Sequence, residues 1–222
     1  MKKTVSLPIA FILISVVISQ SGCLKSSTAD QYPAATATAD TIKGIVQFKQ
    51  TDINGTSLVS WKFGEANISA VSGGTNVFAT SKVQADGSFE LILPATIPGA
   101  YFSNFSDIVY TQGGTLKVTP ETVRLFGSTQ FKVDYTYNGK ARSMIISLAT
   151  LKTDFTVNRT YYFNFYDSNG TFSGKSTSGN VFNWTFTKGW GLVESYLTNI
   201  SSGLFNSKSV SVAPENAVWT NN

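Results

Sequence analysis

The chain has 222 residues, with 17 Lys and Arg, 13 Asp and Glu, one Cys and no His. The absence of His excludes the Ser-His-Asp and Cys-His hydrolases and the histidine-based zinc sites. The single Cys excludes disulfides within the chain and clusters of Cys that bind zinc or iron–sulfur. Charged residues make up 14% of the chain, below the typical ~25%, whereas the apolar share of 42% is ordinary for a packed protein.

The first 22 residues have the pattern of a secretory signal peptide. A basic start, Lys2-Lys3, is followed by an apolar run over residues 7–18 and by small residues before Cys23. The run is shorter than the ~20 residues of a permanent membrane span. The only Cys of the chain, directly after a small-residue pair, resembles the lipobox of bacterial lipoproteins. With Gln20 where an aliphatic residue is usual, it resembles the relaxed lipoboxes of Bacteroidetes-type bacteria. The resemblance implies that Cys23 is lipidated and attaches the mature chain to a membrane.

The mature chain carries little net charge. Loss of Lys2 and Lys3 leaves 15 basic against 13 acidic side chains, a net charge of about +2. No run of Lys or Arg forms a basic patch, so nucleic acid is not an expected partner. Leu24 rather than Asp follows the Cys, which by analogy with enteric lipoprotein sorting favours the outer membrane. We therefore expect an outer-membrane lipoprotein of the bacterial cell envelope, facing the periplasm or the cell surface.

The remainder divides into a tether and a β-rich part. Residues 23–40 are rich in Ser, Thr and Ala without apolar periodicity, which is typical of a flexible tether. Beyond residue 40, short stretches of β-branched and aromatic residues alternate with Gly, Asn, Asp and Pro, which predicts an all-β chain. Asp86-Gly87 and Asn138-Gly139 predict hairpin turns, because these residues tolerate a positive φ. The predicted strands are Ile42–Lys49, Ser57–Phe63, Asn67–Val71, Asn76–Val83, Ser88–Leu93, Ile108–Thr111, Thr115–Val118, Val123–Phe126, Phe131–Tyr137, Arg142–Ser147, Thr160–Tyr166, Thr171–Lys175, Val181–Thr187, Trp190–Glu194 and Val210–Val212.

Three segments of the first half share a pattern: Gly44–Val46, Ile68–Ala70 and Val83–Leu91, the last containing A-D-G-S-F-x-L. With them, residues 41–119 resemble a carboxypeptidase-regulatory-like, transthyretin-like β-sandwich module, in which the last segment is a hairpin with an inward Phe. Residues 120–222 form a second β-rich unit. We expect one or two antiparallel β-sandwich units, Ig-like or transthyretin-like, and the number stays open because ~200 residues can form one all-β domain.

No arrangement of residues predicts catalysis. Glu90 and Asp134 lie in predicted strands, but their spacing in the sequence does not predict a pair of carboxyl groups like that of a glycosidase. The G-x-S-x-G, G-x-G-x-x-G and Walker A motifs are absent. Two D-x-N-G-T segments, at Asp52 and Asp167, lack the further oxygen ligands of a calcium loop and are predicted to be turns. We therefore expect a non-enzymatic protein with no cofactor and no metal.

The aromatic residues of the second half point to binding. A flat aromatic platform beside Asn and Thr suits sugar rings. The predicted ligand-binding residues are Trp190, which lies in a turn-like K-G-W-G segment, Lys188 next to it, and Tyr162 and Tyr166 on one face of a strand. The alternative is that the aromatics fill a core. We expect this for Phe182, Trp184 and Phe186, because aromatic residues dominate core burial.

These observations predict an envelope-anchored lipoprotein for binding or adhesion at the cell surface, with a glycan or an outer-membrane protein as its ligand. A structural or assembly lipoprotein without a small ligand is the main alternative, and an accessory hydrolase is a remote one. An exposed Trp190 would favour a glycan. An unpaired edge strand would favour a protein bound by strand addition. Two facing carboxylates in a cleft would favour the hydrolase.

Overall fold

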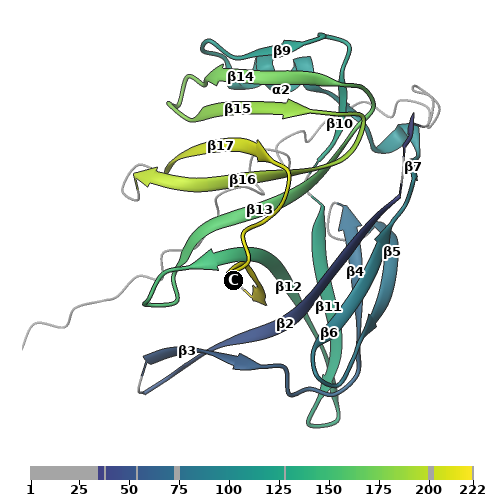
Figure 1. Ribbon diagram of the computed structural model, residues 1–222, viewed down its shortest axis with the longest axis vertical. Helices are drawn as coiled ribbons and strands as arrows, with labels where there is room; N and C mark the ends of the chain where they lie inside the picture. The colour runs from purple at the N-terminus through teal and green to yellow at the C-terminus, as the bar shows by residue number, and fades with distance from the viewer. Residues whose placement is uncertain are drawn as a thin grey trace, which may run out of the picture.

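The structure is a computed structural model that describes residues 35–37, 39–53, 55–72, 76–127, 129–199 and 203–221 (Figure 1). The expected signal peptide, Cys23 and the tether up to residue 34 lie outside these residues. The described chain is mostly β-strand, with one α-helix and one turn of 3-10 helix. The prediction of an all-β protein is therefore confirmed.

Most of the predicted strands are present, and several are longer than expected. The strands are β1 (Ala35–Thr36), β2 (Asp40–Asp52), β3 (Gly55–Ser60), β4 (Ala66–Ser72), β5 (Asn76–Val83), β6 (Ser88–Leu93), β7 (Thr96–Ile97), β8 (Ser103–Asn104), β9 (Lys117–Thr119), β10 (Arg124–Phe126), β11 (Gln130–Tyr137), β12 (Lys140–Leu151), β13 (Val157–Tyr166), β14 (Gly170–Lys175), β15 (Val181–Phe186), β16 (Gly189–Asn199), β17 (Leu204–Val210) and β18 (Val218–Asn221). The helical elements are η1 (Gly99–Tyr101) and α2 (Phe105–Gln112).

Seven strands close into a barrel. Hydrogen-bonded neighbours follow the order β11-β4-β5-β6-β2-β18-β12, and β12 pairs with β11 to complete the ring. The strands β2, β4, β5 and β6 precede residue 119 and β11, β12 and β18 follow it, so both parts of the chain build the barrel. The expected sandwich of two facing sheets is corrected here: apart from the β1–β7 pair, the described strands form one sheet that closes on itself.

Closure depends on the last strand. β18 pairs antiparallel with β12 and parallel with β2, where only two pairs form, Trp219 with Val46 and Thr220 with Gln47. The side chain of Asn221 extends this contact along β2. Its Oδ1 accepts a hydrogen bond from the backbone N–H of residue 49 at 2.6 Å, and its Nδ2 donates to the carbonyl of the same residue at 3.3 Å.

The indole of Trp219 fills the interior of the barrel. It is 3% exposed and packs edge-on against Phe89 and Phe131, with ring centroids 5.4 and 4.9 Å away, and in parallel with Phe163 at 6.1 Å. Gly44 on β2 makes room for it, because a Cβ at this position would lie 2.5 Å from Trp219 Nε1. The barrel core and the pairing of β18 with β2 therefore depend on the same residue.

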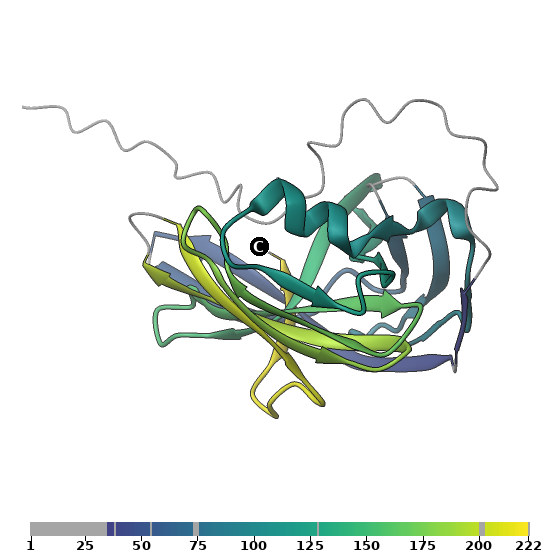
Figure 2. The same cartoon turned by 90° about the horizontal axis from the view of Figure 1, so that it is seen from above.

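Beyond the ring, the sheet continues from β12 through β13, β16, β17, β15 and β14 to β9. Helix α2 lies over one face of this extension (Figure 2). Its first residue, Phe105, packs against Phe172 and Phe186, with centroids 4.5 and 5.8 Å away. Phe182 and Phe186 are buried in this cluster and Trp184 packs against it, so the prediction that these three are core residues is confirmed.

Two local predictions are wrong. Ile108–Thr111, predicted to be a strand, belongs to α2. Its β-branched residues favour a strand, but Phe105, Ile108 and Val109 share one helical face and pack together against the aromatic cluster, and this burial outweighs the local propensity. The sequence pattern also makes Val210–Val212 the last strand, whereas β17 ends at Val210 and the last strand is β18.

The predicted hairpin turns are confirmed. Asn138 and Gly139, with φ of 50° and 70°, join β11 to β12, and Asp86-Gly87, with a Gly φ of 88°, joins β5 to β6. Phe89 after this second turn points inward and is 5% exposed, as the resemblance implied.

Strand pairing begins before the expected end of the tether. β1 pairs with β7, and the N–H of Ala37 donates to the carbonyl of Ala95 at 2.7 Å. The chain is therefore paired with β7 at Ala35–Thr36, and β2 begins at Asp40.

We predict that Gly44→Ala lowers the free energy of unfolding by about 1–3 kcal/mol, because the added methyl group would overlap the buried indole of Trp219. Urea denaturation measures the change. Lys43→Ala is the matched control on the same strand, where only a surface ion pair with Glu90 is lost and about 1 kcal/mol or less is expected. Equal stabilities of the two variants would contradict the prediction.

Candidate functional site

One edge of β2 is open over the first half of the strand. Asp40–Ile45 pairs with β6 on one side. On the other side β18 pairs only with Val46 and Gln47. Within the described part of the chain, no strand pairs with that side of Asp40–Ile45. Backbone groups that a sheet neighbour would normally satisfy are therefore available at this edge.

The hydrogen bonds of β2 show which residues face the open edge. The N–H of Val46 donates to the carbonyl of Gly87 at 2.9 Å, on the side of β6. Lys49 exchanges its backbone bonds with the Asn221 side chain, on the side of β18. Successive residues of an antiparallel strand alternate between the two sides. The backbone N–H and C=O groups of the odd-numbered residues of β2 therefore point toward β18. Nearer the start of the strand, the same groups point toward the open edge.

Three residues have their backbone groups at this edge: Thr41, Lys43 and Ile45. The N–H of Thr41 is already bonded to the Asp40 carboxylate, with a distance of 2.8 Å to Oδ1. The hydrogen bonds of the described residues include no partner for the N–H of Lys43 or Ile45 on this side. The carbonyl of Ile45 takes part in the parallel pairing of Val46 with Trp219, so two donors and the carbonyls of Thr41 and Lys43 are available at the spacing of a β-ladder.

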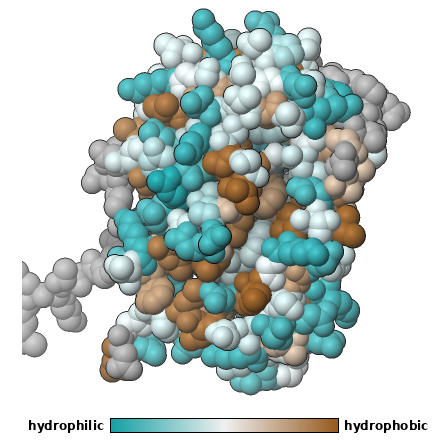
Figure 3. Space-filling model, viewed as in Figure 1, coloured by the Kyte–Doolittle hydropathy of each residue, from teal (hydrophilic) through white to brown (hydrophobic). Residues whose placement is uncertain are grey.

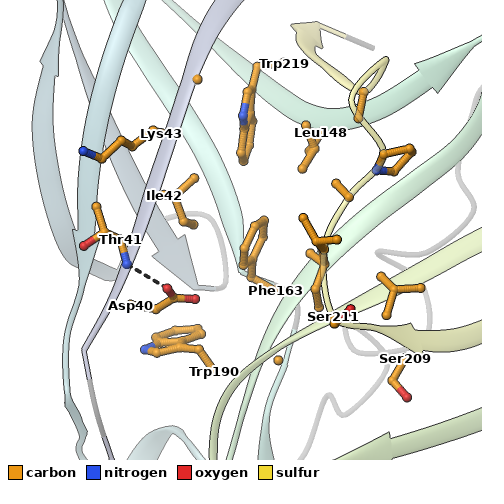
Figure 4. Close-up of a pocket in the computed structure, with 18 of the residues that line it drawn as sticks. Asp40, Thr41, Ile42, Lys43, Leu148, Phe163, Trp190, Ser209, Ser211 and Trp219 are labelled. Carbon is orange, nitrogen blue, oxygen red and sulfur yellow. Dashed lines mark hydrogen bonds between the residues drawn. The ribbon is translucent and has the colours of Figure 1, made fainter.

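The open edge borders a cavity of about 960 Å³. Its other walls are β13, β16 and the chain between β17 and β18. Figure 4 shows Ile42, Leu148 and Phe163 pointing into it beside Trp219, with Trp190 at the opposite end. The volume lies within the ~300–1,000 Å³ range of ligand pockets, and the walls combine apolar side chains with a few polar groups.

The mouth of this cavity is apolar on two sides. Val212 on the loop after β17 is 74% exposed, and Ile45 on β2 is 57% exposed. The loop continues as Ala213 and Pro214, which also line the cavity. Figure 3 shows apolar side chains gathered near the middle of this face, with polar side chains around them. An apolar patch of this kind typically marks an interaction site.

Trp190 is a packed residue rather than a free platform. Its ring is stacked on Phe78, with centroids 6.0 Å apart, and contacts the edges of Phe126 and Phe165 at 6.0 and 5.3 Å. Its Nε1 donates to the carbonyl of Pro94 at 2.9 Å. The side chain is half-buried and only its remaining surface reaches the cavity. Stacking of a sugar ring on both faces is therefore excluded in this conformation.

Tyr166 lines the same cavity but is buried. Its ring is stacked on Phe186, with centroids 4.1 Å apart, and its hydroxyl accepts a hydrogen bond from Asn164 Nδ2 at 3.2 Å. Burial raises the pKa of this hydroxyl far above its ordinary value, although the hydrogen bond from Asn164 opposes the shift. Tyr166 therefore stays neutral and acts in packing.

The other predicted site residues lie elsewhere. Lys188 is exposed in the turn before β16, where its N–H donates to Asn169 Oδ1 at 2.7 Å. Tyr162 is half-buried and lines a separate cavity. Cys23 lies outside the described residues. The structure thus brings Trp190 and Tyr166 to one cavity and places Lys188 and Tyr162 away from it.

The residues that define the site most clearly are not predicted by the sequence. Thr41, Lys43 and Ile45 matter through their backbone groups, and the sequence alone does not show which strand lies beside them. The only signal is the predicted strand over residues 42–49, which gives the alternation but not the open side.

The cavity lacks paired carboxylates. Asp40 is the only carboxylate among its described lining residues. Glu90 forms an ion pair with Lys43 at 2.9 Å, and Asp134 forms one with Lys132 at 3.1 Å. No group of three His, Cys, Asp or Glu side chains gathers in the described chain. The geometry that a glycosidase needs is not formed at this site.

Comparison of the chain with protein-family models, with curated proteins and with solved structures finds no match. The resemblance to a transthyretin-like module and that to bacterial lipoproteins remain predictions. Among the described residues, no helix has the length and apolar character that a membrane crossing requires.

We predict that Trp190→Ala lowers the free energy of unfolding by about 3 kcal/mol, because it removes a ring that packs against three others. Lys188→Ala, two residues away and exposed, is expected to change it by less than about 0.5 kcal/mol. Urea denaturation of both variants tests this. A Trp190→Ala variant as stable as the parent would show that the ring is free for a ligand.

Proposed function

We propose that the protein is an envelope-anchored, non-enzymatic lipoprotein that binds an extended segment of a protein partner along the open edge of β2. The observation that carries this proposal is the row of backbone groups at Thr41, Lys43 and Ile45, beside a cavity of about 960 Å³. An incoming strand would take its main-chain hydrogen bonds from this row. Its alternate side chains would enter the cavity.

The chain itself contains a precedent for this contact. β18 lies on the same side of β2, in parallel, and forms pairs with Val46 and Gln47. Asn221 continues the row at Lys49, where its side-chain amide accepts one hydrogen bond and donates another. The open residues come directly before those that β18 already occupies. A partner segment would therefore extend an existing contact of the sheet toward the beginning of β2.

The chemistry of the cavity favours a polypeptide over a glycan. The ring of Trp190 is engaged by other rings and its N–H is bonded. The amide of Asn164 is buried and bonded to Tyr166. Gln47 is the one side-chain amide among the described lining residues, whereas apolar side chains of a strand would meet Ile42, Leu148 and neighbouring residues.

The proposed place of action is the bacterial outer membrane. Lipidated Cys23 would hold the chain at the membrane, and residues 24–34 would separate it from the barrel by a Ser- and Thr-rich stretch. The barrel would then present the open edge of β2 to a second protein of the envelope. The role would be binding or adhesion without catalysis.

Lys43→Pro is predicted to weaken peptide binding at least about tenfold while the fold is retained. Proline removes the N–H that faces the open edge, and strands tolerate it where that N–H makes no ladder bond. The probe is a set of ten-residue peptides selected on the full chain from a displayed random library, with affinity measured by fluorescence anisotropy. Lys43→Ala keeps the N–H and is expected to bind as the parent does.

Peptides that bind Lys43→Pro as tightly as the parent would refute strand addition at this edge. A glycan array that gives specific signal, together with a failure to select any peptide, would instead assign the cavity to a glycan. Circular dichroism of both Lys43 variants verifies that the fold is kept.

Membrane attachment is tested separately. In cells fed radiolabelled palmitate, the parent chain is expected to carry label and to sediment with the outer membrane. Cys23→Ser is expected to carry none and to leave the membrane fraction, because the acylated residue is lost. Sedimentation of the unlabelled variant with the membrane would contradict attachment through Cys23.

A further inference from the structure

A second cavity, of about 410 Å³, lies toward the other end of β2 from the open edge. It reaches Lys49 and Thr51 of β2, the beginning of β11, the hairpin between β12 and β13, and β16 with β17. The first cavity meets β2 at residues 40–45 and 47, and the second meets it at Lys49 and Thr51. The second cavity is therefore separate from the proposed peptide site, and a ligand bound in it would not depend on peptide binding at the open edge.

Aromatic rings without a ring partner converge on this second cavity. Nearly every aromatic side chain of the described residues contacts another ring. The exceptions are Tyr110, Phe155, Tyr161, Tyr162 and Tyr196. Tyr110 is 89% exposed, and the other four all line the cavity. In a protein that pairs its rings so consistently, four rings without a ring partner around one cavity favour an aromatic occupant.

Phe155 reaches the cavity at the expense of backbone strain. Its φ is +60°, a left-handed conformation in which a bulky side chain is an outlier. The turn that holds it is closed by two hydrogen bonds of 2.9 Å, from Phe155 N–H to the Lys152 carbonyl and from Lys152 N–H to the Thr156 carbonyl. Glycine would fit this position without strain. The phenyl ring is instead half-buried at the cavity wall, and strain of this kind tends to persist at ligand sites.

Thr129 supplies a polar group without a partner. The residue is 5% exposed and lines the cavity, but its Oγ1 is buried, shielded from the cavity in this structure, and has no hydrogen-bond partner among the described residues. A buried hydroxyl without a partner is unfavourable and calls for an explanation. The cavity lining also includes Tyr162, whose pKa is raised to about 12 by burial, so this phenol is neutral at physiological pH.

From these observations we propose that the second cavity is a binding site for a planar aromatic compound that carries one hydroxyl group. The aromatic part would lie among Phe155, Tyr162 and Tyr196. The Arg159 guanidinium lies over the Tyr196 ring, 4.8 Å from its centroid, so the ligand would contact only the remainder of that ring. The hydroxyl would bond to Thr129 Oγ1 after a rotation of the Thr129 side chain about χ1 turned this shielded atom toward the ligand. The ligand would thus satisfy both features that the chain leaves open, and it would use the ring that the strained turn holds at the wall.

The test compares 2-naphthol with naphthalene as probes of the full chain, by ligand-observed NMR titration. The parent is expected to bind 2-naphthol about five- to tenfold more tightly than naphthalene, the effect of one net hydrogen bond. Thr129→Val removes the hydroxyl at nearly constant volume. In this variant the two probes are expected to bind equally, with the affinity for naphthalene unchanged.

Phe155→Gly is expected to lower the affinity for both probes by about tenfold, because a ring contact is lost. The urea midpoint of this variant is expected to stay close to that of the parent, because the relief of the positive φ offsets the loss of the half-buried ring. Tyr110→Ala is the matched control, because it removes an exposed ring without a ring partner. It should leave the affinity for both probes unchanged.

Three outcomes would overturn the proposal. The parent would bind neither probe. Alternatively, Thr129→Val and Phe155→Gly would both bind the probes as the parent does, which would place them elsewhere on the molecule. Finally, a lower urea midpoint of Phe155→Gly with unchanged binding would show that the ring serves the fold alone.

Discussion

The barrel depends on the insertion of Trp219 between β2 and β12. β18 has four residues, yet it joins the two strands that would otherwise leave the ring open. The indole carries most of this contact, because it lies among three phenyl rings and directly over Gly44. Backbone pairing with β2 at two positions would be weak alone. Burial of a large aromatic surface is what makes so short a strand sufficient.

The difference in length between β2 and β18 leaves one edge of β2 open beside the first cavity. β2 has 13 residues and β18 covers only its middle. On one side of the covered residues the edge stays open beside the first cavity, and on the other side the Asn221 amide takes over before the second cavity begins. A longer β18 would have covered this edge. The same short pairing that ends the fold thus leaves open the edge that we propose binds a peptide.

The sequence predicts what is local and misses what depends on distant neighbours. Asn138-Gly139 determines its own turn through positive φ, and alternation locates strands such as β5 and β6. β18 is too short to show a period, and its parallel partner is more than 170 residues away in the chain. Trp190 lies between glycines, a setting that favours exposure, but Phe78, Phe126 and Phe165 reach it from other strands. The open edge itself leaves no trace in composition, because it is defined by how far a distant strand extends.

The two cavities use different parts of the polypeptide for recognition. At the edge of β2 the donors and acceptors belong to the backbone, so they repeat every second residue and suit any extended chain, while selectivity must come from the side chains that enter the apolar space. In the second cavity the backbone is occupied by pairing, and recognition rests on the side chains of Phe155, Tyr162 and Thr129. The first arrangement favours a polypeptide of loosely defined sequence. The second favours a small compound of defined shape, because rings on a β-framework are held with little conformational freedom.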